Sequence, residues 1–210
     1  MYKINYQKVL EMKLKQIEKE EKKPKLLLHA CCAPCSSYVL EYLSQYFLID
    51  VYYYNPNISS KDEYQQRAFE LVRFVKEKEF PNPVKVIIED YNPEEFYEIA
   101  HGLEACEEGG KRCFECYKLR LERTAEKALI GGYDYFTTTL SISPLKNAKK
   151  LNEIGADLQH DYGIHYLFSD FKKKDGYKRS IELSKEFNLY RQRYCGCIFS
   201  KKNTAVCKTE

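Results

Sequence analysis

Short apolar runs alternate along this chain with longer segments in which apolar residues recur every three or four positions. The runs lack the polar alternation of half-exposed strands, so they predict strands that are buried on both faces. The longer segments have the spacing of helices that pack one face against a core. The predicted strands are 25–29, 48–54, 84–89, 135–138 and 165–168. The predicted helices are 36–46, 62–78, 93–100, 113–130, 146–160 and 177–187.

This alternation of strands and helices predicts the α/β class. Strands that are joined through helices run parallel, so we expect a single doubly wound, mainly parallel sheet of about five strands flanked by helices, in a Rossmann-like or HUP-like arrangement. An extra amphipathic helix is expected within residues 2–23, where apolar side chains stand among many charges. Its apolar positions are Ile4, Val9, Met12, Leu14 and Ile17.

Polar side chains follow the end of every predicted strand. Because the carboxyl ends of parallel strands meet at one edge of a sheet, these side chains are expected to form one shared site. They are Cys31 and Cys32, Asn55 and Asn57, Asp90, Thr138 and Thr139, and Asp170.

Composition and charge narrow the class of protein. The 210 residues contain no apolar run of membrane-spanning length, and residues 1–25 lack the apolar core of a signal peptide, so we expect a cytoplasmic protein without a membrane partner. The formal net charge of +3 neither requires nor excludes a nucleic acid. Basic clusters indicate either a solvated surface or RNA contacts. They are Lys146, Lys149 and Lys150; Lys172 to Lys174; Lys178 and Arg179; and Arg191 and Arg193.

The nine cysteines are the main candidates for chemistry. A reducing compartment disfavours a disulfide framework, and clustered cysteines there more often bind metal or carry out redox reactions. Cys31 and Cys32 follow the first predicted strand, and Pro34 predicts a helix start beside them, which favours thiolates. Cys113 and Cys116 share one face of a helix, either as ligands or as two ordinary buried cysteines. Two such pairs make four thiolates, the usual complement of a structural zinc or a [4Fe–4S] cluster.

Cys195, Gly196 and Cys197 form a third group. A disulfide across one intervening residue is strained, and strained disulfides tend to be redox-active, although two metal ligands or two inert thiols fit the same spacing. Cys35 is either a ligand of a second metal or a thiol at a helix end. Cys106 and Cys207 stand apart and are interpreted as incidental, and His29 is interpreted as a core residue.

Several cofactor classes lack their motifs. Radical chemistry with S-adenosylmethionine requires CxxxCxxC, but Tyr38 occupies the third cysteine position. The chain contains neither a Walker loop nor a glycine-rich dinucleotide fingerprint, and we do not expect it to bind ATP.

A set of motifs resembles a known family over nearly all of residues 25–200. These motifs are Leu28-His29-Ala30-Cys31-Cys32-Ala33-Pro34-Cys35-Ser36, Asn55-Pro56-Asn57-Ile58, Gly109-Gly110, Arg112-Cys113, Cys116-Tyr117, Arg120-Leu121, Thr124-Ala125, Thr138-Thr139-Leu140, Ser143-Pro144, Leu189-Tyr190-Arg191-Gln192 and Tyr194-Cys195-Gly196-Cys197. Together they resemble the QueH-type epoxyqueuosine reductases. With this resemblance we expect an N-terminal helix in residues 1–24, a metal-binding α/β catalytic domain in 25–200 and a tail in 201–210.

The resemblance implies an oxidoreductase that removes the epoxide oxygen from epoxyqueuosine at the wobble position of a tRNA anticodon and yields queuosine. It implies a [4Fe–4S] cluster, an additional iron site and no cobalamin. Its partners are tRNA that carries epoxyqueuosine and a low-potential electron donor of unknown identity. The implied cluster ligands are Cys31, Cys32, Cys113 and Cys116, and the implied redox-active pair is Cys195 and Cys197.

Other residues acquire candidate roles from this reaction. Asp90 or Asp170 is a candidate proton donor, although each also fits a structural role at a strand end. Arg191, Arg193 and Lys172 to Lys174 are candidate phosphate contacts, and Tyr53, Tyr54 and Tyr194 are candidates for stacking on a base. Two rival functions remain: a zinc-stabilised RNA-binding module and an iron–sulfur electron carrier. Neither rival requires a redox-competent Cys195–Cys197 pair.

Overall fold

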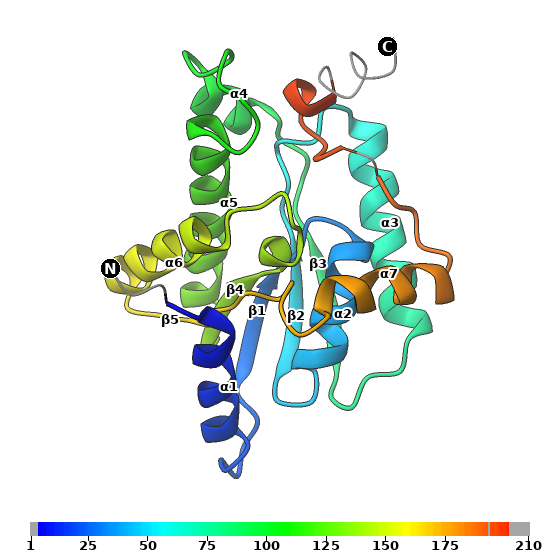
Figure 1. The fold of residues 1–210 in the computed structure, drawn as a ribbon, viewed down its shortest axis with the longest axis vertical. Helices are drawn as coiled ribbons and strands as arrows, with labels where there is room; N and C mark the ends of the chain where they lie inside the picture. Colours follow the sequence, from blue (N-terminus) through cyan, green and yellow to red (C-terminus); the bar gives the residue numbers. More distant parts are fainter. Residues whose placement is uncertain (1–3, 193, 202–210) are drawn as a thin grey trace.

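Strand β1 (Lys25–His29) is the central strand of a five-stranded, all-parallel sheet in the computed structural model, which describes residues 4–192 and 194–201 (Figure 1). The strand order is β3-β2-β1-β4-β5, and each strand pairs in parallel with its neighbours. The predicted doubly wound α/β fold is therefore confirmed. The other strands are β2 (Leu48–Tyr53), β3 (Val84–Ile88), β4 (Tyr135–Thr138) and β5 (His165–Tyr166).

The strands β1, β2 and β4 are largely buried, as the continuous apolar runs predict, whereas the edge strand β3 is half-buried to exposed. Leu26 and Leu28 of β1 belong to the apolar cluster on one face, and Leu27 belongs to the cluster on the other. The first face is covered by α1 (Tyr6–Ile17), α2 (Ala33–Leu43) and α3 (Lys61–Glu77), and α7 (Gly176–Glu186) packs on α2. The second face is covered by α5 (Lys111–Ile130) and α6 (Ala148–Tyr162), and α4 (Glu94–Ala100) packs on α5 (Figure 1).

The N-terminal helix exists, but α1 is shorter than residues 2–23 and buries a partly different set of side chains. Leu14 and Ile17 are buried as expected, together with Gln7 and Leu10. Met12, which was assigned to the apolar face, is 60% exposed. The buried positions follow the helical repeat from Gln7, and Met12 falls outside this stripe. No helix in residues 4–192 or 194–201 has the length and apolar content to cross a membrane.

The first residues of helices α2 and α3 determine which side chains lie at the carboxyl edge of the sheet. Helix α2 begins at Ala33, three residues before the prediction, and Cys32 occupies its N-cap position with Pro34 in the first turn. The helix predicted over residues 62–78 begins at Lys61 as α3, and Ser60 is its N-cap, with an Oγ that accepts from the Glu63 N–H at 3.2 Å. The earlier start of α2 places Cys31, Cys32 and Cys35 around a single helix end.

The sheet order reverses between β1 and β4, the two neighbouring strands from which the chain proceeds in opposite directions. Such a switch point opens a crevice at the carboxyl ends of the strands. A short 3-10 helix, η1 (Thr139–Ile142), follows β4 directly where only a turn was predicted. Its first residue brings Thr139 Oγ1 to 3.9 Å from Cys31 Sγ. Two loops that are distant in sequence thus meet at the crevice.

Candidate active site

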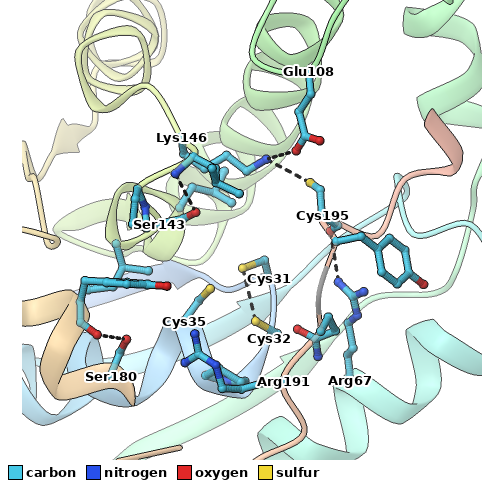
Figure 2. Close-up of a pocket in the computed structure, with 18 of the residues that line it drawn as sticks. Cys31, Cys32, Cys35, Arg67, Glu108, Ser143, Lys146, Ser180, Arg191 and Cys195 are labelled. Carbon is cyan, nitrogen blue, oxygen red and sulfur yellow. Dashed lines mark hydrogen bonds and ion pairs between the residues drawn. The ribbon is translucent and has the colours of Figure 1, made fainter. Parts of the chain in front are cut away.

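A cavity of about 370 Å³ occupies this crevice (Figure 2). Its floor comes from the loop after β1 and the start of α2, and one wall comes from η1 and the residues that follow it. The segment after α7 returns across the opposite side and supplies Cys195. The charged and thiol-bearing residues of the lining are Cys31, Cys32, Cys35, Cys195, Arg67, Arg120, Lys146, Arg191 and Glu108.

The thiols of Cys31, Cys32 and Cys35 gather on one side of the cavity (Figure 2), with all three sulfur atoms within 4.8 Å of one another. Hydrogen bonds from Cys32 and Cys35 hold the pKa of Cys31 well below its usual value, although burial opposes this shift. The same hydrogen bonds and burial raise the pKa of Cys35. Three soft ligands at this separation can bind a metal ion. Cys35, whose role the sequence left open, is thus part of the compact group.

Cys113 and Cys116 lie in the first turns of α5, on one helix face as predicted. Cys113 Sγ accepts from the Gly109 N–H at 3.2 Å. Cys116 is packed in an apolar cluster with Cys197, and burial raises its pKa. Neither sulfur belongs to the compact group of Cys31, Cys32 and Cys35 among the residues that the structure describes. The set of four cluster ligands therefore stays a prediction.

Cys195 faces the cavity, whereas Cys197 is buried behind it. The Lys146 ammonium donates to Cys195 Sγ at 3.1 Å (Figure 2). A hydrogen bond from the Cys197 thiol and the positive charges of Lys146 and Arg120 hold the pKa of Cys195 well below its usual value, although burial opposes this shift. The same thiol–thiol hydrogen bond and burial raise the pKa of Cys197. The pair is chemically asymmetric: the sulfur that reaches the cavity is the one whose pKa is lowered.

The backbone around Cys195 is fixed by several contacts. Arg67 Nη1 donates to the Cys195 carbonyl oxygen at 3.2 Å, and the Gly196 carbonyl accepts from the Ser59 N–H at 2.9 Å. Gly196 has a φ of +114°, and a Cβ at this position would lie 2.9 Å from Arg67 Nη1. Only glycine fits both the backbone angle and this close approach.

Three buried cations surround the thiols, and the sequence patterns did not single them out as site residues. Lys146 belongs to a basic cluster that the sequence assigns either to a solvated surface or to RNA contacts, but it is only 9% exposed, and its Nζ lies 3.8 Å from Glu108 Oε1. Arg67 of α3 pairs with Glu63 at 2.7 Å. Arg120 of α5 is 1% exposed. The spacing of Arg120 from Cys113 and Cys116, at i+7 and i+4, was a signal that could have placed it on the same helix face.

The other predicted strand-end residues separate into two groups. Asn55 belongs to the site, because its side chain donates to the Ala30 carbonyl at 2.9 Å and accepts from Arg120. Asp90 instead lines a separate groove next to β2 and β3, and Asp170 pairs with Lys172 at 2.7 Å. Neither carboxylate lines the cysteine cavity. The expectation of a single site shared by all five strand ends is therefore only partly met.

His29 and the candidate aromatic residues are also placed. The buried His29 ring accepts from Thr138 Oγ1 at 2.8 Å and donates to the Tyr54 carbonyl at 3.1 Å, which agrees with a satisfied core residue. Burial lowers its pKa to about 3. Tyr53 is enclosed in the core, whereas Tyr194 lines the cavity. Arg193 and Cys207 lie outside the described residues.

Comparisons with known proteins agree on one family. The sequence model described as epoxyqueuosine reductase QueH matches residues 26–203. A protein of that name from Streptococcus pyogenes serotype M1 is 48% identical over 97% of this chain and 81% of its own length. Another from Staphylococcus epidermidis is 48% identical over 97% of this chain and 87% of its own. A third protein of that name, from Thermotoga maritima, is 35% identical over 83% of this chain and 89% of its own length.

The fold also aligns with a solved structure. The solved protein, from Methanocaldococcus jannaschii, is described as a predicted subunit of tRNA methyltransferase; the alignment has a TM-score of 0.49 and 16% identity over 77% of the present chain and 74% of the solved one.

Proposed function

Because the chain belongs to the QueH family of epoxyqueuosine reductases, we propose that it reduces epoxyqueuosine to queuosine at the tRNA anticodon wobble position with a [4Fe–4S] cluster and without cobalamin. The chain is an oxidoreductase by its family. The observation that carries the finer proposal is the convergence of four cysteine side chains, Cys31, Cys32, Cys35 and Cys195, on one cavity at the switch point of the sheet.

The reaction sets the requirements for this cavity. Converting an epoxide to an alkene breaks two C–O bonds, forms a C=C bond and releases the oxygen as water, which consumes two electrons and two protons. Oxidation of two thiols to one disulfide supplies two electrons and two protons. We propose that Cys195 and Cys197 are this dithiol, with Cys195 as the member that reaches the substrate. An external low-potential donor then restores the thiols.

The cysteines fit a thiolate-bound metal group. Thiolates are the preferred ligands of iron–sulfur clusters, and Cys31, Cys32 and Cys35 place three of them within 4.8 Å. The buried cations Arg120 and Lys146 favour a negatively charged occupant. We propose Cys31, Cys32, Cys113 and Cys116 as the cluster ligands, with Cys35 available to a second iron. When bound, an iron–sulfur cluster supplies one-electron transfers.

We further propose that the anticodon loop of tRNA lies over the cavity mouth. The exposed Arg191 lines this cavity, and the exposed Lys173 precedes α7, where it can contact a phosphate. Of the other two lysines in this predicted set, Lys172 pairs with Asp170 and Lys174 pairs with Glu11. Tyr194 also lines the cavity, with the Arg67 guanidinium 5.4 Å from its ring centroid, and offers a surface for stacking. Bases of an anticodon loop are already unpaired, so the modified base can enter without opening a helix.

The first experiment measures the metal content and then turnover. Anaerobically purified protein is expected to be brown, to contain about four or five irons per chain and to bleach with a strong reductant. It should convert epoxyqueuosine in tRNA to queuosine, as measured by nucleoside mass spectrometry. A colourless protein with one tightly held zinc would instead favour the RNA-binding module. An iron–sulfur protein that leaves epoxyqueuosine intact with every low-potential donor would favour the electron carrier.

A further inference from the structure

Arg120 is the cation around which the cysteine groups are arranged. It lies on the same face of α5 as Cys113 and Cys116, and its side chain is almost fully enclosed. Its Nε donates to the Cys116 carbonyl oxygen at 3.3 Å, and its Nη1 donates to Asn55 Oδ1 at 3.2 Å. Asn55 in turn donates to the carbonyl of Ala30, the residue before Cys31. The guanidinium therefore links the α5 cysteines to the loop that carries Cys31.

This guanidinium lacks the partner that a buried cation requires. Its Nη2 atom has no hydrogen-bond acceptor among the described residues. No carboxylate in the described part of the chain forms an ion pair with it, and the acidic groups that raise its pKa against burial are the thiols of Cys116, Cys195 and Cys31 and the phenol of Tyr117. A buried charge is costly unless an opposite charge compensates it. The compensating charge for Arg120 must therefore come from thiolates or from what they hold.

Arg67 differs from Arg120 in having a carboxylate partner. Both guanidinium groups are buried and line the cavity, but Arg67 has a carboxylate partner in Glu63 at 2.7 Å. The positive charge of Arg67 is thus balanced within α3. The charge of Arg120 remains available to the site.

We propose that Arg120 is a positioning residue that raises the reduction potential of the redox groups in this cavity. A fixed cation stabilises the reduced, more negative state of a thiolate-bound metal group, and net charge and hydrogen bonds are established determinants of such potentials. Arg120 is expected to raise the reduction potential of the Cys195–Cys197 pair as well, because the reduced state of this pair is the one that contains a thiolate. The part that concerns the metal group rests on the proposed function, whereas the part that concerns the dithiol does not require a metal.

The test compares Arg120→Gln with Arg120→Lys in the full-length, anaerobically purified protein. Arg120→Gln removes the charge but keeps a donor for Asn55, and Arg120→Lys keeps the charge. The matched control is Arg123→Gln on the same helix, because Arg123 is 46% exposed and paired with Glu95 and Glu126. Potentials of the metal group are measured by dye-mediated titration of the visible spectrum. Potentials of the dithiol are measured in metal-free protein by thiol labelling in dithiothreitol buffers.

We expect Arg120→Gln to shift the reduction equilibrium of the metal group at least tenfold toward the oxidised form, which is 59 mV for a one-electron couple. A shift of the same sign is expected for the dithiol, while Arg120→Lys and Arg123→Gln stay close to the wild type. Unchanged potentials in Arg120→Gln, or equal shifts in Arg123→Gln, would overturn the proposal.

Two further outcomes separate this proposal from the proposed function. If the wild-type protein holds only zinc, the iron–sulfur assignment fails, and the dithiol measurement still decides the role of Arg120. If Arg120→Gln folds but loses its metal, the Arg120→Lys variant decides the question. An Arg120→Lys protein that retains its metal with an unchanged reduction potential supports the role of the positive charge. A folded Arg120→Lys that also loses its metal overturns it.

Discussion

The cysteine cavity and the groove beside β2 and β3 organise their charges in opposite ways. The groove beside β2 and β3 is the larger, at about 630 Å³ against about 370 Å³ for the cysteine cavity. Its cations Arg123 and Lys127 pair with Glu95 and Glu89. In the cysteine cavity, Arg120 has no carboxylate partner in the described chain, and the ammonium of Lys146 lies closer to Cys195 than to Glu108. Uncompensated charge, rather than size, distinguishes the candidate active site.

The sharpest test of this contrast is the removal of one sulfur. Cys195→Ser is expected to reduce turnover of epoxyqueuosine by on the order of a thousandfold or more, because it removes half of the dithiol. Iron content should stay at the wild-type value. Asp90→Asn in the groove should leave turnover unchanged. Loss of iron from Cys195→Ser would make Cys195 a ligand and contradict its assignment as a redox thiol.

A second test concerns the backbone that presents this sulfur. Gly196→Ala combines an unfavourable φ with a contact at 2.9 Å to Arg67, and should lower the free energy of unfolding by about 2 kcal/mol or displace Cys195. Gly132→Ala, at the end of the helix that borders the groove, has a positive φ but no atom within 4 Å of the added Cβ. Gly132→Ala should lower the free energy of unfolding by about 1 kcal/mol. Urea unfolding measures both, and equal losses would show that the contact with Arg67 is unimportant.

A third test addresses the thiolate. In metal-free protein, Cys195 should react with iodoacetamide at lower pH than an ordinary thiol, since its depressed pKa keeps the thiolate populated as the pH falls. Lys146→Met should move this rate profile upward by about one pH unit, because an adjacent cation is removed. Lys127→Met in the groove serves as the control. Identical profiles for the wild type and Lys146→Met would show that Lys146 does not stabilise the thiolate.

The smallest expected effect concerns RNA at the cavity mouth. Arg191→Gln should weaken binding of an anticodon stem–loop severalfold and reduce the slope of log K against log salt by about 0.7, the value for one phosphate contact on a single strand. Arg123→Gln should leave both quantities unchanged, because Arg123 faces the groove and is already paired. Fluorescence anisotropy across a salt series measures the slopes. A larger effect from Arg123 would place the RNA on the groove instead.

The sequence patterns predicted the framework well, because local hydrophobic periodicity determines it. The observed bounds of β1 and β4 equal the predicted ones, and the remaining strands end one or two residues early. The patterns also placed Cys31, Cys32 and Thr139 correctly at one edge, since this follows from parallel strands alone. The sequence patterns did not predict the position of a side chain where that position depends on the path of a loop. Asp90 turns toward the groove, and the path of the chain after η1 buries Lys146 beside Cys195.

The cations of the cavity were harder to predict for a related reason. A lysine or arginine is ordinarily assigned to the surface, and its burial depends on which thiols or carboxylates other segments bring near it. Arg67 belongs to α3 and contacts the carbonyl of Cys195, which is far away in the sequence. No local pattern contains this pairing. The charge contrast between the cavity and the groove is visible only once the chain is folded.

The position of Cys195 in the chain has a consequence for biosynthesis. Cys195 follows Cys31, Cys32 and Cys35 in the chain, so a ribosome releases the segment with these three cysteines before the segment with Cys195. Until that later segment emerges and binds Arg67 and Ser59, the cavity lacks one wall and the early thiols remain open to solvent. The nascent chain thus passes through a period in which its thiols are accessible to metal donors and to oxidants alike, and the docking of the Cys195 segment ends this period.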